Sequence, residues 1–198
     1  MTRTETPWGV WEPLSLAETT TIFDELDRPW WIAGGYAVEL AVGYAFREHS
    51  DIDVLLLRPD QLAVQRLLPG WEWWAADPPG TLRPWQPGEI LPPHVHDIWC
   101  RPGPDEPWRL QFMLDETDGA DWVSRRDPRL RRPIASLGEH HVLVPEIQLF
   151  YKARAPRPKD EQDFAELLPI LTGEQRRWLI EAVELAGGSP SWLAQLRA

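Results

Sequence analysis

The chain has 198 residues, 43% of them hydrophobic and 26% charged, which is the composition of a folded soluble protein with one substantial domain. Its formal net charge of −11 disfavours nucleic acid as the main substrate, because the average surface repels phosphate backbones. The sequence has no apolar run near the roughly 20 residues that span a bilayer and no signal-peptide pattern, and its lone Cys100 excludes an internal disulfide. We expect a cytoplasmic protein with no membrane partner.

The first third of the chain predicts alternating helices and strands. Ser15 and Glu18 form a capping box, which predicts that a helix begins there and runs over residues 15–27. Apolar patterning then predicts a strand, a buried helix, a second strand and an amphipathic helix, at residues 30–33, 36–46, 51–57 and 60–68.

The middle of the chain predicts more strands around one long loop. A strand is expected over residues 71–77, and six prolines within residues 78–93 exclude regular structure there. Two further strands are expected over residues 95–101 and 108–114, joined by a Pro- and Gly-containing turn. The predicted sheet is therefore mixed.

The last quarter of the chain predicts helices alone. Breaks at Pro and Gly divide it into four of them, at residues 146–155, 159–171, 174–186 and 190–197. We therefore predict an α/β (α+β) fold, with a mixed-sheet core over residues 1–143 and a small helical region over residues 144–198.

The most informative segment is residues 34–57, which opens on a glycine pair and closes on two aspartates at the head of an apolar strand. Side chains two apart on a strand share a face, so Asp51 and Asp53 are expected to project together while Ile52 points into the core. Two adjacent carboxylates suit Mg²⁺, which prefers carboxylate oxygen and keeps positions for substrate phosphates. The pair predicts a divalent-cation site for work on a nucleoside triphosphate.

This segment resembles the nucleotidyltransferase superfamily, whose distant members include DNA polymerase beta. Within that superfamily it is most similar to the aminoglycoside 2''-adenylyltransferases and lincosamide nucleotidyltransferases, and the similarity lies in the phrase Trp31-Ile32-Ala33-Gly34-Gly35 followed by Arg47-x-His49-x-Asp51-x-Asp53. The alternative is an acidic surface turn that happens to precede a strand.

The resemblance implies an enzyme that transfers a nucleoside monophosphate, most simply AMP from ATP, to a hydroxyl of a small acceptor, with Mg²⁺ held by Asp51 and Asp53. Gly34 and Gly35 would let the backbone approach the triphosphate. Arg47 and His49 are expected to contact the nucleotide as well, although a lone histidine is more often a structural hydrogen-bonding residue. An aminoglycoside or lincosamide antibiotic is the implied acceptor, and an acidic surface would attract the ammonium groups of an aminoglycoside.

The superfamily usually has a third carboxylate on a neighbouring strand, as metal ligand or general base. The corresponding position in this chain falls near Gln111, which cannot act as a base. Asp115 or Asp97 could substitute, and we prefer Asp115 because it follows Gln111 on the same strand face. The catalytic set is therefore predicted to be Asp51, Asp53 and Asp115.

Both lysines of the chain, Lys152 and Lys159, lie in one helical segment, whereas the other basic residues are arginine. The segment resembles the Lys-Asp-x-x-Asp region of related nucleotidyltransferases, which implies that these lysines bind the nucleotide. The alternative is a solvated helix with an ion pair between Lys159 and Asp163.

Two other functions stay open. The glutamine at position 111 allows a degenerate fold that binds nucleotide or a partner without turnover, and a toxin-like transferase acting on tRNA or protein is the other alternative. We expect a monomer or a homodimer.

Overall fold

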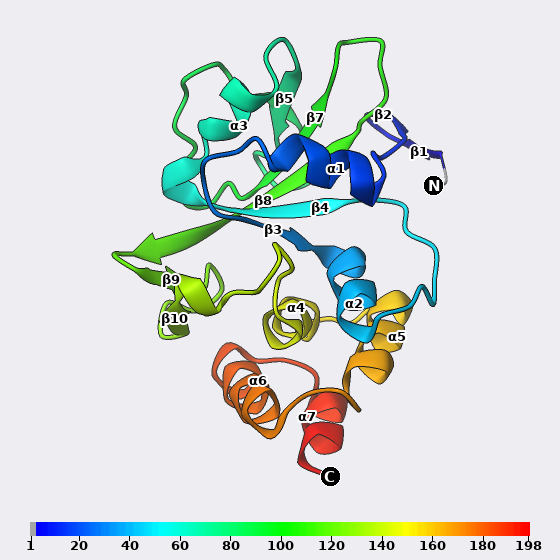
Figure 1. Cartoon of the computed structure of the whole chain (residues 1–198), viewed down its shortest axis with the longest axis vertical. Helices are drawn as coiled ribbons and strands as arrows, with labels where there is room; N and C mark the ends of the chain where they lie inside the picture. The colour runs from blue at the N-terminus through cyan, green and yellow to red at the C-terminus, as the bar shows by residue number, and fades with distance from the viewer. Residues whose placement is uncertain (1–2) are drawn as a thin grey trace.

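A mixed β-sheet forms the middle of the structure, a computed structural model that describes residues 3–198 (Figure 1). Its strands follow the order β10-β9-β8-β7-β5-β6, and β4 pairs with β8 on one side and β3 on the other. A separate two-stranded sheet, β1 with β2, stands at the N-terminal end. The strands are β1 (Thr4–Thr6), β2 (Gly9–Trp11), β3 (Trp30–Ala33), β4 (Asp53–Leu57), β5 (Glu72–Ala75), β6 (Arg83–Pro84), β7 (Asp97–Arg101), β8 (Leu110–Asp118), β9 (Asp121–Val123) and β10 (Arg131–Pro133).

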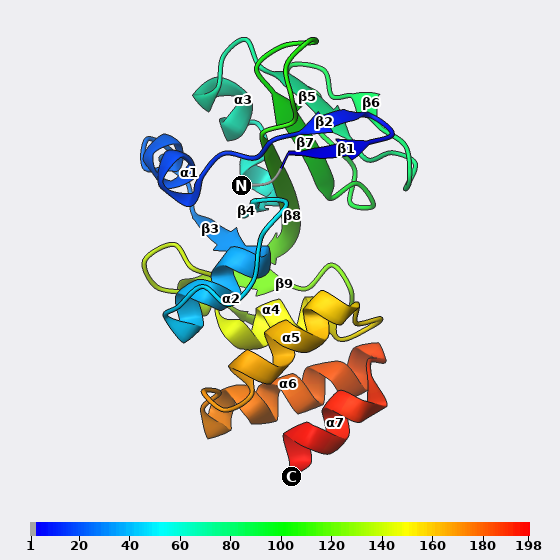
Figure 2. The ribbon, with the colours of Figure 1, turned by 90° about the vertical axis from the view of Figure 1, so that its right-hand side faces the viewer.

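The helices lie on both faces of the sheet (Figures 1 and 2). Their bounds are α1 (Leu16–Phe23), α2 (Gly34–Val42), α3 (Ala63–Leu67), α4 (Pro145–Lys152), α5 (Pro158–Leu167), α6 (Gly173–Ala186) and α7 (Pro190–Arg197), with 3₁₀ turns at Arg58–Asp60 and Ile134–Ser136. Because neighbouring residues of a strand point to opposite faces, β4 contributes Val54 and Leu56 to a core that includes Phe23 of α1, and Leu55 and Leu57 to a core that includes residues of α4 to α7.

Strand β4 has one antiparallel and one parallel neighbour. Asp53 pairs with Ala33 of β3 and with Gln111 of β8, and Leu57, at the other end, pairs with Asp115. The start of β4 therefore lies beside the end of β3, where α2 begins.

The predicted fold class is confirmed, and most elements lie within a few residues of their predicted positions. The capping box of Ser15 and Glu18 is formed, and it starts α1 as expected. Helix α2 is shorter than predicted because Gly43, in the left-handed conformation, ends it. The predicted helix over 60–68 is a 3₁₀ turn followed by a single short helix.

Three details differ from the sequence predictions. Strand β4 begins at Asp53, so Asp51 precedes the strand and does not belong to it. The proline-rich loop contains the two-residue strand β6, in which Pro84 is tolerated because β6 is the last strand of the sheet order. The short pairs β1–β2 and β9–β10 were not predicted, because three-residue strands carry little periodicity.

The division at residue 144 stays a prediction. The core that contains the helices α4 to α7 also contains Leu55, Trp122 and Leu137, which precede residue 144. The helices α4 to α7 therefore bury part of their apolar surface against residues that precede position 144.

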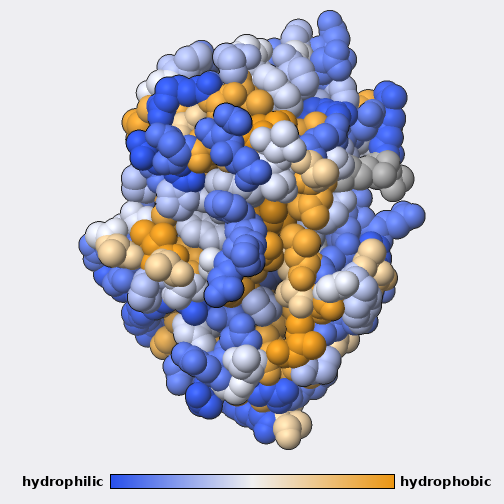
Figure 3. All heavy atoms as spheres, viewed as in Figure 1, coloured by the Kyte–Doolittle hydropathy of each residue, from blue (hydrophilic) through white to orange (hydrophobic). Residues whose placement is uncertain are grey.

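The face seen in Figure 1 is largely hydrophilic, with a band of apolar residues down its middle (Figure 3). Leu40 of α2 and Tyr44 after it are among the large apolar side chains that the structure exposes. Among residues 3–198, each helix is too short or too polar to cross a membrane.

Candidate functional site

The glycine pair and the first residue of β4 meet at one point. Gly34 has a φ of +64°, which side chains with a Cβ rarely adopt. A Cβ at Gly34 would overlap Oδ2 of Asp53 and lie 2.9 Å from its Cγ. The Gly34 N–H donates a 2.9 Å hydrogen bond to Oε1 of Gln148 in α4. Both the conformation and the close approach of Asp53 therefore require glycine here.

The carboxylate of Asp53 lies in a strongly negative environment. Burial, then the charges of Asp51 and Asp97, raise its pKa to about 7, against the opposing charges of Lys152 and Lys159. Asp51 is more exposed, with 33% of its side chain accessible. The structure thus brings together Asp51, Asp53 and Asp97, with lysine ammonium groups close by.

Asp97 and Gln111 are linked across two strands. Gln111 Nε2 donates a 2.8 Å hydrogen bond to Oδ1 of Asp97 on β7, and Gln111 is the register partner of Asp53. Burial raises the pKa of Asp97, while this hydrogen bond and the Arg125 charge lower it. Gln111 therefore occupies the place next to Asp53 and holds a carboxylate from the following strand beside it.

Asp115 lies elsewhere. It pairs with Leu57, at the far end of β4 from Asp53, and four residues of extended chain span roughly 13 Å. Its side chain is fully buried and accepts hydrogen bonds from Trp122 Nε1 at 2.7 Å and Tyr151 OH at 2.8 Å, in addition to an ion pair with Arg125. The structure does not bring Asp115 to the aspartate pair.

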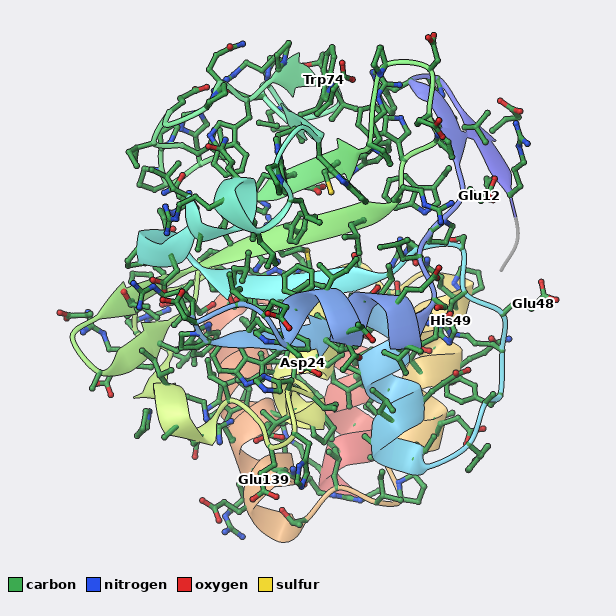
Figure 4. All side chains as sticks on the ribbon, turned by 45° about the horizontal axis from the view of Figure 1, so that its top comes forward. Glu12, Asp24, Glu48, His49, Trp74 and Glu139 are labelled. Carbon is green, nitrogen blue, oxygen red and sulfur yellow. The ribbon has the colours of Figure 1, made fainter. Side chains whose placement is uncertain are left out.

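Arg47 and His49 pack directly on Gly35. A Cβ at Gly35 would overlap the Arg47 guanidinium and the His49 ring. Arg47 donates to both carboxylate oxygens of Asp163, at 2.6 Å and 3.0 Å. His49 Nε2 lies 2.9 Å from Oε1 of Glu39 in α2, and the His49 side chain is only 4% exposed. Figure 4 shows His49 turned toward α2.

Lys152, at the end of α4, belongs to a buried ion cluster. Its Nζ lies 3.0 Å from Asp160 and 2.9 Å from Asp163. Asp163 is completely buried and also binds Arg47, and hydrogen bonds from Arg157 together with the Lys152 charge hold the pKa of Asp160 well below its usual range. Lys152 is therefore committed to holding α4, α5 and the segment before β4 together.

Lys159 has a different environment from Lys152. Its Nζ lies 3.9 Å from Oδ2 of Asp51, and 35% of its side chain is exposed. Arg157 is more exposed still and pairs with Asp160, and the charges of Asp51 and Asp53 help to raise its pKa. Arg157 at the N-cap of α5 and Lys159 in its first turn are thus the cations close to the aspartate pair.

The arginine-rich segment at residues 125–132 is used for internal ion pairs and hydrogen bonds. Arg126 donates to the carbonyl groups of Phe150 and Tyr151, and the other pairs are Arg125 with Asp115, Arg129 with Asp127, Arg131 with Asp118, and Arg132 with Glu146. These contacts use the arginines of the segment to hold neighbouring parts of the chain together.

Sequence reasoning missed two contributors to the site. Gln148 was missed because an isolated glutamine in an amphipathic helix carries no pattern, yet it accepts the hydrogen bond from Gly34. Arg157 was missed because its relation to the aspartate pair arises only from the docking of α5. The choice between Asp97 and Asp115 depended on which strands are neighbours, and spacing alone does not decide that.

Comparisons with known proteins agree with the motif. The sequence model described as aminoglycoside-2''-adenylyltransferase matches residues 15–71. A solution structure of the antibiotic-resistance factor ANT(2'')-Ia is similar with a TM-score of 0.53 and 18% identity, over 85% of this chain and 92% of that one. The lincomycin-bound lincosamide adenylyltransferase LnuA is similar with a TM-score of 0.51 and 15% identity, over 81% and 100%.

A crystal structure of ANT(2'')-Ia with adenylyl-2''-tobramycin gives a TM-score of 0.48 and 14% identity, over 86% of this chain and 96% of that one. No curated protein matches the chain significantly. At these identities the two likenesses with TM-scores above 0.5 show a shared fold and no more. The resemblance found in the sequence, to the aminoglycoside and lincosamide branch of the nucleotidyltransferases, is confirmed by the family match and this fold.

Proposed function

We propose that this chain is a Mg²⁺-dependent nucleotidyltransferase that moves a nucleoside monophosphate, most simply AMP from ATP, to a hydroxyl of a small-molecule acceptor. The observation that carries the proposal is that Asp53 lies against Gly34 with Asp51 and Asp97 close by. Burial, followed by the charges of Asp51 and Asp97, raises the pKa of Asp53 to about 7. Such a concentration of carboxylates is costly in a protein that has no cation to bind there.

The chain's residues suit a Mg²⁺ ion. Asp51 and Asp53 offer hard oxygen donors, and Mg²⁺ is commonly held by one or two carboxylates plus substrate phosphates and water. The described residues contain no group of three or more ligating side chains already gathered for a metal, so we assign the remaining positions to the triphosphate and solvent. When bound, the ion would neutralise phosphate charge during transfer.

The transfer is an in-line displacement at the α-phosphorus. The acceptor oxygen forms a bond to that phosphorus, the bond to the bridging oxygen of the β-phosphate breaks, and pyrophosphate leaves with the electron pair. The hydroxyl proton passes to a carboxylate, for which we propose Asp97 in place of Asp115. Burial raises the pKa of Asp97, which makes its carboxylate a better proton acceptor near neutral pH.

We assign the phosphate-binding role to Lys159 and Arg157. Both are accessible and near the aspartate pair, whereas Lys152, Arg47 and His49 are buried in contacts of their own. In this proposal those three hold the loop that carries Asp51. Gly34 leaves the space beside the backbone that the Asp53 carboxylate occupies.

The proposal is tested by turnover. Incubation with ATP or another nucleoside triphosphate, Mg²⁺ and a panel of aminoglycosides and lincosamides should release pyrophosphate, and the double variant Asp51→Asn, Asp53→Asn should not. Asp27→Asn is the control, because the Asp27 side chain is 81% exposed. A folded double variant with undiminished turnover would contradict the metal-site assignment.

A second function rests on Gln111. An amide stands beside Asp53, so a nucleotide-binding protein without turnover is the alternative. This alternative would be favoured if calorimetry finds ATP binding, if Asp97→Asn leaves that binding unchanged, and if no acceptor yields a product.

A further inference from the structure

The N-terminal hairpin is fixed to the segment that immediately precedes β8. Its strands β1 and β2 pair antiparallel, with Gly9 at a φ of +112° in the turn. Trp108 donates from its backbone N–H to Val10 at 2.8 Å, and from Nε1 to the carbonyl of Trp8 at 2.9 Å. Glu12 N–H in turn donates to the Trp108 carbonyl at 2.9 Å. The hairpin precedes residues 15–71, to which the family model matches.

An open pocket lies between this hairpin and the aspartate pair. Its volume is about 130 Å³, and its lining comprises Thr4 and Thr6 of β1, Trp11 of β2, Ser50, Asp51, Trp99 of β7 and Gln111 of β8. Asp51 belongs to the proposed metal site, and Gln111 binds Asp97. A ligand in this pocket would therefore lie beside both the proposed metal and the proposed base.

The pocket has an aromatic wall. The ring centroids of Trp11 and Trp99 lie 4.9 Å apart, and Trp108 packs behind Trp99 at 5.7 Å. Trp11 is 5% exposed, and its Nε1 is buried without a hydrogen-bond partner among the described residues. A buried indole N–H normally finds an acceptor, so a ligand oxygen at this wall would satisfy it.

The pocket has little charge. Among the described residues that line it, Asp51 alone is ionisable, and the others are threonine, serine, glutamine and tryptophan. The nearby Glu12 and Glu72 are already paired with Arg109 and Arg101. Asp53 and Asp97 also lie close to Asp51 and Gln111, but the proposed function assigns Asp53 to the metal and Asp97 to the transferred proton. A polycation would therefore lose hydration here and gain few uncommitted carboxylates in return. A sugar-like molecule with an apolar face can instead stack on the indoles and hydrogen-bond to the hydroxyl and amide groups.

The pocket and the proposed phosphate ligands belong to different elements of the fold. Lys159 and Arg157, the proposed phosphate ligands, come from α5, whereas the pocket is built from the hairpin, β7 and β8. In-line transfer requires the acceptor and the leaving pyrophosphate on opposite sides of the α-phosphorus. With pyrophosphate bound at α5, an acceptor held in the pocket would present its hydroxyl from the side of the hairpin.

We propose that this pocket is the acceptor subsite, and that it selects a glycoside-like molecule with an apolar face and at most one positive charge. This inference rests on the proposed function for its chemistry, but the subsite binds its ligand whether or not transfer follows. It replaces the expectation that the acidic charge of the chain selects a polycation.

The test measures binding and turnover separately, with the full chain and two probes. Lincomycin represents a glycoside with one basic group, and tobramycin represents a polycation. Calorimetry without nucleotide should give a Kd for lincomycin at least tenfold lower than for tobramycin. Trp11→Leu should raise the lincomycin Kd at least tenfold and leave ATP binding within twofold.

Two further variants separate the wall from the fold. Trp11→Phe keeps a ring and removes the N–H, so it should weaken lincomycin binding severalfold even where Trp11→Leu proves unstable. Glu5→Gln is the control, since Glu5 is on the same hairpin, is exposed and does not line the pocket. It should leave both Kd values unchanged.

The possible failures are distinct. Tighter binding of tobramycin, no binding of lincomycin to the unaltered chain, or equal binding by the Trp11 variants would overturn the subsite. A loss of ATP affinity in Trp11→Leu with acceptor binding retained would also overturn it, since the pocket would then hold the nucleotide base. Lincomycin binding that depends on Trp11 without any pyrophosphate release would support the subsite and contradict the transferase.

Discussion

Oδ2 of Asp53 occupies the space into which a side chain at Gly34 would project. We therefore expect Gly34→Ala to displace the Asp53 carboxylate and to abolish nucleotidyl transfer. Gly43→Ala is the matched control, because Gly43 also has a positive φ, of +84°, but a Cβ there would meet nothing within 4 Å. Both changes should cost about 1–2 kcal/mol of stability through the backbone, and only Gly34→Ala should lose more than 90% of turnover. Equal activity of the two variants would argue against the site.

The raised pKa of Asp53 predicts a pH-dependent gain in stability for Asp53→Asn in metal-free buffer. Below pH 4, Asp53 is protonated in both the folded and the unfolded chain, so the variant and the unaltered chain should have the same stability there. Between pH 4 and about 7 the unfolded chain ionises while the folded chain does not, which penalises folding of the unaltered protein alone. Above pH 7 the variant should be more stable by at least about 1 kcal/mol, roughly 2–4 °C in Tm.

Thermal scans of both proteins at half-unit pH steps measure this difference directly. Asp27→Asn, at an exposed position, should give a flat difference over the same range. A metal-free Asp53→Asn protein that is less stable than the unaltered chain at pH 8 would mean that Asp53 is not held in a negative environment.

Asp163 predicts a large loss of stability without any direct part in chemistry. Asp163→Asn leaves the buried Arg47 and Lys152 without their shared carboxylate, and breaking a buried ion pair typically costs about 3–5 kcal/mol. Urea unfolding measures the loss. Asp118→Asn, whose side chain is 67% exposed and pairs with Arg131, should stay within about 0.5 kcal/mol. A loss below 1 kcal/mol at position 163 would be at odds with a structural ion cluster.

The two lysines should respond differently to removal of their charge. Lys159→Met should raise the KM for ATP at least tenfold and leave the free energy of unfolding unchanged, because Lys159 is accessible and only approaches Asp51. Lys152→Met should destabilise the fold, because Lys152 is 8% exposed and bound by two aspartates. Lys159→Arg should restore much of the ATP affinity. The opposite assignment of effects would mean that Lys152 binds the nucleotide.

Asp97 and Asp115 can be separated by comparing kcat with stability. Asp97→Asn should lower kcat by about 10²–10⁴, the usual contribution of a general base, with the fold retained. Asp115→Asn should destabilise the fold, because the buried Asp115 carboxylate accepts hydrogen bonds from Trp122 and Tyr151 and pairs with Arg125. The folded fraction of this variant should retain kcat. A normal kcat in Asp97→Asn would remove Asp97 from the mechanism.

The sequence was sufficient to identify features that depend on local patterns. The capping box at Ser15, the glycine pair and the helices near the C-terminus follow from spacing and from Pro and Gly positions, and the structure has them close to where they were expected. The mixed sheet also followed, since the number and spacing of apolar runs fix the class of fold.

The site could be predicted only in part, because its remaining members meet through register and docking. Whether Asp97 or Asp115 lies near Asp53 depends on β4 and β8 being parallel and on which residue lies opposite Asp53. The difference between Lys152 and Lys159 depends on the side of α5 that faces α4. The pocket at the hairpin depends on two three-residue strands, which are too short to show a period.

The bond from Arg47 to Asp163 joins parts of the chain that are 116 residues apart. Lys152 shares the same aspartate, so the segment carrying Asp51 is seated by the far end of the polypeptide. Gene exchange between relatives with a crossover near codon 144 would separate these partners and leave an arginine facing a foreign helix. Productive recombinants should therefore inherit residues 47, 152 and 163 from one parent, and the tail of this protein should evolve in step with its first fifty residues.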